Sequence, residues 1–230
     1  MMDPFRLMCA LAVRAPFDRT ILPRFAASGG KIDVVWGPTT VIQEKLAHGE
    51  AADAVLLTAE AVDALVADRT LDGSTRVEVA TSQLGVAVPR GSRRPDLSTE
   101  ASFRQALLDA RSVAFSRGGA SGIYFAGLLE RMGIAEAVRA KATIIPAGFT
   151  AEKLVSGEAD MAVQQVSELM VVGGVDIVGP FPDVVQARMR FSAAAVAGSP
   201  ARPSVRALLA SLREEEAKAA FRACGLDPAA

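Results

Sequence analysis

Residues 116–125, SRGGASGIYF, form a glycine- and serine-rich segment between two apolar stretches. Residues 112–115 before it make a short apolar run that is typical of a buried strand, and residues 126–132 after it have the apolar spacing of a helix. A strand, a tight turn and a helix start in this order direct free backbone N–H groups and the positive end of the helix dipole into the turn. The segment therefore predicts an anion site.

Side-chain donors in this turn support an anion. Ser116 and Ser121 supply hydroxyl groups, and Arg117 supplies a guanidinium. Backbone contacts are expected at Ala120 and Gly122. The alternative is a capped helix start in which the glycines serve only the tight turn.

Strands and helices alternate outward from this segment along the whole chain. Apolar runs predict further strands at 5–13, 31–36, 54–57, 83–88, 142–146, 159–164, 175–178 and 190–196, with helices between them and one closing helix over 203–223. This alternation predicts an α/β protein in which mostly parallel sheets are flanked by helices. Ligands bind such sheets at the carboxyl ends of strands. Turns at 11–14, 37–40, 116–122 and 148–150 occupy these places, two in each half of the chain, which predicts a cleft between two lobes.

Composition excludes several classes of function. The 230 residues carry a formal net charge of −1 with no block of Lys or Arg, so no nucleic-acid partner is expected. No apolar run approaches the roughly 20 residues that span a bilayer, so no membrane insertion is expected. His48 lies at a predicted helix end, and Cys9 and Cys224 lie far apart. We therefore expect no metal, no cofactor and two buried thiols, with a disulfide as the alternative.

The first residues bear on the compartment. Residues 7–13 are too short for the apolar core of a secretory signal, and Arg14 interrupts them. The sequence as it stands predicts a cytoplasmic protein. A periplasmic location is the alternative, if an export signal has been removed from the chain.

Three stretches resemble one family in this order: VVWGPTTVIQEKLAHGEAADAVLL at 34–57, GASGIYFAGLLERMGI at 119–134 and LVSGEADMAVQQVSELM at 154–170. They are similar to bacterial solute-binding proteins of the molybdate-binding type, whose relatives include aconitate isomerases. The resemblance implies a two-lobed type II periplasmic-binding fold. One lobe would comprise 1–82 and 193–230 and the other 83–192, with crossings near 82–84 and 191–194. For an exported protein it also implies the membrane component of an ABC transporter as a partner.

The resemblance also implies a binding site for a small anionic ligand. In the family, backbone N–H groups and hydroxyls of four turns hold an oxyanion. The matching positions in this chain are Ala12, Val13, Thr39, Thr40, Ser121, Phe149 and Thr150, and Gly148 of the fourth turn is a further candidate for ligand binding.

The chain departs from the family pattern in ways that favour a carboxylate. The first turn lacks the expected serine, and Gln164 and Gln165 stand where a tyrosine is expected. Arg14 and Arg117 flank the predicted cleft, and a guanidinium matches a carboxylate with two hydrogen bonds. The sequence therefore predicts a binding protein for an organic di- or tricarboxylate rather than molybdate, closing about a hinge. The alternative for each arginine is a solvated surface charge.

An isomerase on the same fold is the second hypothesis. An aconitate isomerase-like reaction moves an allylic proton and a double bond within a tricarboxylate, which requires fixed carboxylates and a base. The candidate groups are Glu168, whose alternative is an ionised side chain favouring a helix N-terminus, and Tyr124, whose alternative is a packing residue with a tethered hydroxyl.

Overall fold

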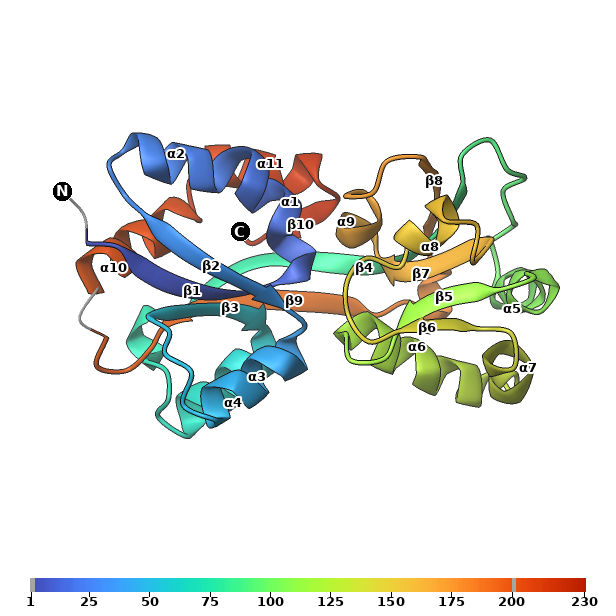
Figure 1. Cartoon of the computed structure of the whole chain (residues 1–230), viewed down its shortest axis with the longest axis horizontal. Helices are drawn as coiled ribbons and strands as arrows, with labels where there is room; N and C mark the ends of the chain where they lie inside the picture. The colour runs from blue at the N-terminus through green and yellow to red at the C-terminus, as the bar shows by residue number, and fades with distance from the viewer. Residues whose placement is uncertain (1–2, 200–201) are drawn as a thin grey trace. The chain divides into compact units, whose positions relative to one another are not determined.

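The fold is a mixed α/β arrangement of open sheets with flanking helices, as expected. The computed structural model describes residues 3–199 and 202–230 (Figure 1). Its contacts divide the chain into unit 1, Met1–Ser82 with Met189–Ala230, and unit 2, Gln83–Arg188. The chain passes between the units within β4 (Val77–Pro89) and at the start of β9 (Arg188–Ala195). That these units are the rigid lobes of a closing protein stays a prediction.

Unit 1 is built on a sheet with the strand order β2-β1-β3-β9-β4, and β10 also pairs with β4. Pairing is parallel among β1, β2 and β3, and antiparallel between β3 and β9. The remaining strands are β1 (Phe5–Ala10), β2 (Ile32–Gly37), β3 (Ala54–Thr58) and β10 (Leu226–Pro228). The helical segments are η1 (Leu11–Val13), α1 (Arg14–Pro16), the π-helical η2 (Phe17–Ile21), α2 (Leu22–Ala27), α3 (Thr39–Ala47), α4 (Ala59–Ala67), η3 (Gly73–Thr75), α10 (Arg202–Ser211) and α11 (Glu215–Ala223).

Both faces of the unit 1 sheet are covered, because successive side chains of a strand point to opposite faces. Leu7 of β1 packs in a cluster with Phe25 of α2 and Phe221 of α11. Its neighbour Met8 packs in a second cluster with Ile42 of α3. This two-sided burial explains why the strands are apolar at nearly every position.

Unit 2 has its own sheet, in which β7 lies between β4 and β5, β6 follows β5, and β8 pairs with β4. Its remaining strands are β5 (Val113–Ser116), β6 (Thr143–Ile145), β7 (Met161–Gln165) and β8 (Val175–Pro180). Its helical segments are α5 (Glu100–Asp109), α6 (Ala120–Arg131), α7 (Ala135–Arg139), α8 (Glu152–Val155), α9 (Val166–Leu169) and η4 (Asp183–Val185).

Two separate cores stabilise unit 2. An aromatic cluster joins Phe103 of α5 to Phe181 at 4.6 Å between ring centroids, and Phe125 of α6 to Phe115 of β5 at 5.2 Å. A second cluster contains small and aliphatic residues of β4, β5, β7, α8 and α9, among them Leu169. Leu169 thereby anchors α9 to the sheet.

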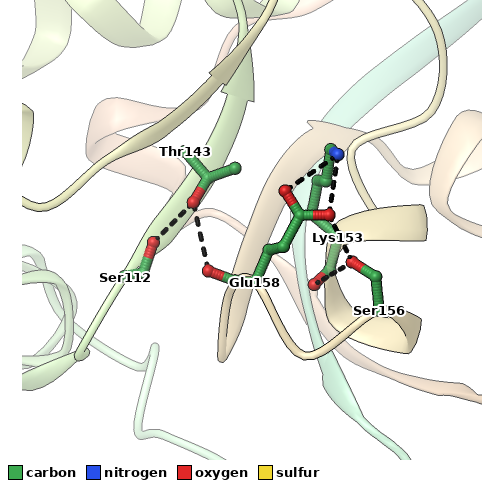
Figure 2. A network of polar contacts seen from close by, with 5 residues as sticks. All are labelled: Ser112, Thr143, Lys153, Ser156 and Glu158. Atoms are coloured by element: carbon green, nitrogen blue, oxygen red, sulfur yellow. Dashed lines mark hydrogen bonds and ion pairs between the residues drawn. The ribbon is translucent and has the colours of Figure 1, made fainter.

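A polar network ties together the amino ends of the three parallel strands of unit 2 (Figure 2). Ser112, just before β5, donates to Thr143 Oγ1 at 2.8 Å, and Thr143 donates to the Glu158 carbonyl oxygen at 3.1 Å. The Glu158 carboxylate accepts from Lys153 at 2.9 Å and from Ser156 at 2.8 Å. These hydrogen bonds, that of Lys153 first, hold the pKa of Glu158 below its usual range. The network therefore fixes where β5, β6 and β7 begin.

The expected closing helix over 203–223 is wrong in one respect, because two helices, α10 and α11, occupy this stretch. Glu214 is the N-cap residue of α11 without a capping side-chain hydrogen bond, and Glu215 and Glu216 lie in the first turn of the helix. Acidic side chains stabilise a helix N-terminus, so the run of glutamates starts a new helix instead of continuing the first.

Candidate functional site

In unit 1 the turns that follow β1 and β2 lie beside each other. The strands are parallel neighbours, and Ala10 is in register with Gly37, so their carboxyl ends coincide. Five predicted ligand-binding residues gather at this edge, namely Ala12, Val13, Arg14, Thr39 and Thr40. Ala12, Val13 and Thr39 are buried.

The guanidinium of Arg14 is held from two sides. Its Nε lies 3.1 Å from Asp18 Oδ2, and its Cζ lies 5.8 Å from the ring centroid of Trp36. Trp36 in turn meets Phe17 edge to face. Arg14 is therefore positioned at the carboxyl edge by specific contacts, while 40% of its side chain is exposed. An exposed, positioned guanidinium can bind a carboxylate through two hydrogen bonds.

The start of α3 supplies the second turn of this edge. The Thr39 hydroxyl accepts a hydrogen bond from the Thr58 N–H at 3.4 Å, which ties α3 to the end of β3. The N-cap residue is Pro38, and no side chain caps the helix. The first-turn N–H groups of α3 therefore receive no acceptor from a capping side chain.

In unit 2 three parallel strands end along one edge. β5 has β6 on one side and β7 on the other, and Ser116 is in register with Ile145. Just beyond, the Arg117 N–H donates to the Ile145 carbonyl at 2.8 Å. The turns at 117–119 and 146–150 and the start of α9 therefore share this carboxyl edge, as predicted for a parallel sheet.

The N-terminus of α6 has the properties of an anion cradle. Gly119 is its N-cap with no side-chain cap, and its first backbone hydrogen bond runs from Ile123 N–H to Gly119 O. The N–H groups of Ala120, Ser121 and Gly122 come before that bond, and such first-turn groups have no intrahelical acceptor. They would hold an anion together with the positive end of the helix dipole.

Ser116 adds an unsatisfied donor to this cradle. The residue is 2% exposed, and its hydroxyl has no hydrogen-bond partner. A Cβ placed on Gly119 would lie 2.6 Å from this hydroxyl oxygen, so the hydroxyl lies against the helix start. A buried polar group without a partner costs about 1–3 kcal/mol, which a bound anion would recover. The side chain of Arg117, by contrast, is exposed.

The fourth turn, at 148–150, is held by hydrogen bonds between the Gln164 side chain and the backbone of the turn. Gln164 Oε1 accepts from the Thr150 N–H at 2.8 Å, and Gln164 Nε2 donates to the Gly148 carbonyl at 2.9 Å. Gly148 adopts φ +102°, which favours glycine. Thr150 and Gln164 therefore shape the turn around Phe149, and direct ligand contact by either residue stays a prediction.

Glu168 lies in the first turn of α9, where it was expected, but it is 6% exposed. Burial raises its pKa to about 8, and hydrogen bonds from the Gln165 N–H and the Gln164 side chain offset this only in part. This raised pKa opposes the ionised side chain assumed in the alternative for Glu168, because desolvation penalises the charged form. Its neighbour Gln165 is also buried.

Other candidate groups have structural contacts. The Tyr124 hydroxyl donates to the Val185 carbonyl at 2.9 Å, which confirms the tethered packing residue. His48 follows α3 and donates to the Glu44 carbonyl, as expected for a helix C-terminus. Cys9 and Cys224 are buried free thiols rather than a disulfide. Among residues 3–199 and 202–230, no three His, Cys, Asp or Glu side chains are grouped to hold a metal ion.

Trp36 lies at the carboxyl edge of unit 1 beside Arg14 and was not among the predicted site residues. The signal was available, since Trp36 is the sole tryptophan and directly precedes the turn after β2. An indole at a strand end can support a guanidinium from a neighbouring strand. The pairing with Arg14 depends on strand order, which the sequence does not state.

The sequence of this chain matches one protein family and is similar to a protein of named activity. The family described as bacterial extracellular solute-binding protein matches residues 5–227. An aconitate isomerase from Pseudomonas sp is 37% identical over 217 residues, covering 91% of this chain and 82% of that protein.

Solved structures match the fold at lower sequence identity. The periplasmic molybdate-binding protein of Azotobacter vinelandii superposes with a TM-score of 0.80 at 15% identity, over 96% of this chain and 98% of that one. The sulfate-binding protein of Mycobacterium tuberculosis H37Rv gives 0.76 at 18% identity, over 98% and 86%. The type II periplasmic-binding fold is thereby confirmed. Within the described parts of the chain, no helix is both long and apolar enough to cross a bilayer.

Proposed function

Because the chain belongs to the bacterial extracellular solute-binding protein family, we propose that it binds a tricarboxylate of the aconitate type and interconverts its cis and trans isomers. The observation that carries this proposal is the 37% identity to an aconitate isomerase across 91% of the chain. The isomerase was the second hypothesis from the sequence, and this relative supports it over binding alone.

Each unit, taken by itself, offers donors that suit a carboxylate. The α6 cradle with Ser116 offers neutral donors for one carboxylate. Arg14 offers a positioned guanidinium on unit 1, and Arg117 an exposed one on unit 2. Guanidinium groups favour planar carboxylates over tetrahedral oxyanions.

The proposed reaction is an allylic proton shift. A methylene proton is removed, the electron pair spreads over three carbons, and a proton returns to the other terminal carbon, so the double bond moves by one position. Fixed carboxylates stabilise the charge that develops, and one base carries the proton. The reaction consumes no oxidant, no water and no cofactor.

Proton NMR with cis-aconitate tests the proposal directly, and a thermal-shift panel tests binding. A ligand at 100 times its Kd stabilises the protein by about 2.7 kcal/mol, which shifts the Tm by several degrees. Catalytic appearance of trans-aconitate, with a shift for tricarboxylates, is expected. No shift and no conversion with tricarboxylates would refute the proposal.

A carrier for an organic di- or tricarboxylate is the second candidate, favoured by the description of the family as extracellular solute-binding proteins. Such a carrier would act in the periplasm and deliver its ligand to the membrane component of an ABC transporter. A tricarboxylate-dependent shift in Tm without conversion would identify this candidate.

Replacing Arg117 by alanine should weaken tricarboxylate binding at least tenfold, while the Tm of the free protein changes little because the side chain is exposed. Isothermal titration calorimetry measures the first quantity and a thermal melt the second. Arg111→Ala is the control, since Arg111 is exposed and lies at the amino end of β5. A large loss of Tm in Arg117→Ala would show a structural role instead.

Replacing Arg14 by serine should weaken a tricarboxylate roughly 10- to 100-fold and leave sulfate or molybdate binding nearly unchanged, because the lost bonds are charge-assisted and bidentate. Calorimetric titration with each anion provides the comparison. Arg6→Ser is matched to it: Arg6 is similarly exposed and pairs with Asp33 at 2.9 Å, but it lies near the amino end of β1. Equal weakening for all anions would contradict a selective role for Arg14.

A further inference from the structure

Within residues 3–199 and 202–230, no cationic side chain pairs with the buried carboxyl of Glu168. Burial is the main cause of its raised pKa, and no charged side chain contributes to the shift. Buried carboxyls that only stabilise a fold are normally paired with a cation, because an unpaired buried charge is costly. An unpaired, buried carboxyl at the ligand edge is instead typical of acid–base catalysis.

The charged groups on the elements around α9 have other partners. β7 carries none, and neither does the part of β4 in unit 2. On β8, Asp176 accepts from the Gly91 N–H at 3.0 Å and lies 3.9 Å from Arg94. On α8, Lys153 pairs with Glu158 and Glu152 is exposed. The ionisation of Glu168 is therefore governed by its burial and by hydrogen bonds from β7.

Glu168 lies on the same sheet edge as the α6 cradle. β5 and β7 are paired in parallel, with Ala114 in register with Ala162, which places Ser116 level with Gln164. Glu168 follows Gln164 by four residues, in the first turn of α9. Its carboxylate accepts from the Gln165 N–H at 3.4 Å, and Leu169 fixes the helix in the core. The carboxyl group is thus held in place at the edge where the anion is expected.

We propose, on the basis of the proposed isomerase function, that Glu168 is the group that removes and returns the allylic proton. A Glu168 oxygen accepts the methylene proton and forms an O–H bond as the C–H bond breaks. The electron pair passes into the three-carbon allylic system and its carboxylates. Glu168 then gives the proton to the opposite terminal carbon, the double bond forms one position along, and the carboxylate is regenerated.

The other candidate acid–base groups among the described residues form structural contacts or lie outside the carboxyl edge of unit 2. The Tyr124 hydroxyl is bonded to Val185 O, and His48 is bonded to Glu44 O. Cys9 is fully buried in β1, and Cys224 follows α11, with Arg19 Nη1 4.0 Å from its sulfur. Glu168 is the group whose place at the carboxyl edge of unit 2 suits the step.

The test compares Glu168→Gln with the wild-type protein by proton NMR of cis-aconitate, in H2O for conversion and in D2O for deuterium entry at the allylic carbons. Glutamine is isosteric with the protonated acid, so the fold and ligand binding should persist. We expect conversion and exchange to fall 10²- to 10⁴-fold while the Kd for aconitate changes less than about threefold. Glu136→Gln makes the same change in the exposed first turn of α7 and should convert at the wild-type rate.

A pH profile separates catalysis from structure. Because the step begins with ionised Glu168, wild-type kcat/KM should rise with pH and level off above about pH 8. A flat profile, an undiminished Glu168→Gln rate, or parallel loss of binding and conversion would overturn the role of Glu168 while the proposed function stands. Wild-type protein that converts no aconitate would refute the proposed function, and this role with it.

Discussion

Replacing Gly122 by alanine is expected to destabilise the protein by about 3 kcal/mol or more and to abolish anion binding at the α6 cradle. An added Cβ would lie 1.7 Å from the backbone oxygen of Ser116 and 2.8 Å from its hydroxyl. A backbone atom cannot move aside as a flexible side chain can, so α6 must separate from the end of β5. Forcing atoms into a packed site typically costs about 1–3 kcal/mol. Urea denaturation, with anion titration by calorimetry, measures both effects.

Gly127→Ala is the matched control in the same helix. Its Cβ would meet only Arg131 Nη1, at 3.6 Å, which is an ordinary contact. Alanine is a better helix former than glycine by about 1 kcal/mol, so Gly127→Ala should be neutral or stabilising. If Gly122→Ala were as stable as this control, the close contact between α6 and Ser116 would be disproved.

Glu168→Gln is expected to change how stability depends on pH. The carboxyl is protonated in the folded protein up to about pH 8, whereas in the unfolded chain it ionises near its ordinary pKa of 4.5. At this site the folded state therefore binds more protons between these values, and the contribution of Glu168 to the free energy of unfolding falls as pH rises through this window. The difference between the two pKa values corresponds to about 5 kcal/mol in the free energy of unfolding, and this contribution is fully lost above pH 8.

Glutamine cannot ionise and therefore lacks this loss. Glu168→Gln should match the wild type near pH 4 and be more stable by several kcal/mol at pH 9, as measured by urea denaturation at each pH. All other titrating groups cancel in the difference between the two proteins. Glu136→Gln should follow the wild-type curve, because Glu136 is exposed. Parallel curves for Glu168→Gln and the wild type would show that Glu168 is ionised in the fold.

Glu168 is therefore expected to lower the stability of the protein while it supports the activity. The wild-type protein keeps a carboxyl that destabilises it increasingly as the pH rises above about 4.5, where glutamine would fit without that cost. Residues that reduce stability in this way are commonly retained for function. The combination of a more stable and less active Glu168→Gln variant would fit this pattern.

Local sequence predicted the strand–turn–helix around Ser116 well, because the apolar run of β5, the glycines and the spacing of α6 agree with one another. The sequence also predicted that, within each unit, the turns lie at the carboxyl ends of the parallel strands, since parallel strands share a direction. It predicted only 83–88 of β4, which in fact begins at Val77. Polar residues such as Glu78 and Ser82 interrupt the first half of that strand, whose pairing with β10 joins distant parts of the chain.

Features of the site that depend on burial escaped prediction. The raised pKa of Glu168 follows from its enclosure, which no sequence spacing reveals. The unsatisfied hydroxyl of Ser116 depends on the close approach of Gly119 and Gly122. The position of Arg14 over Trp36 depends on β1 and β2 being neighbours. Local sequence patterns predict which residues follow the strands, whereas tertiary packing determines their burial, their pKa values and their hydrogen-bond partners.

The network of Ser112, Thr143 and Glu158 has a consequence for how such a protein can diverge (Figure 2). It fastens the three parallel strands of unit 2 at the end away from the α6 cradle, so their alignment does not rely on residues of the turns. Substitutions at exposed positions of those turns, such as Arg117, can therefore accumulate without loosening the sheet. In this chain, the positions that set the strand alignment are thereby separate from the exposed turn positions that would face a ligand.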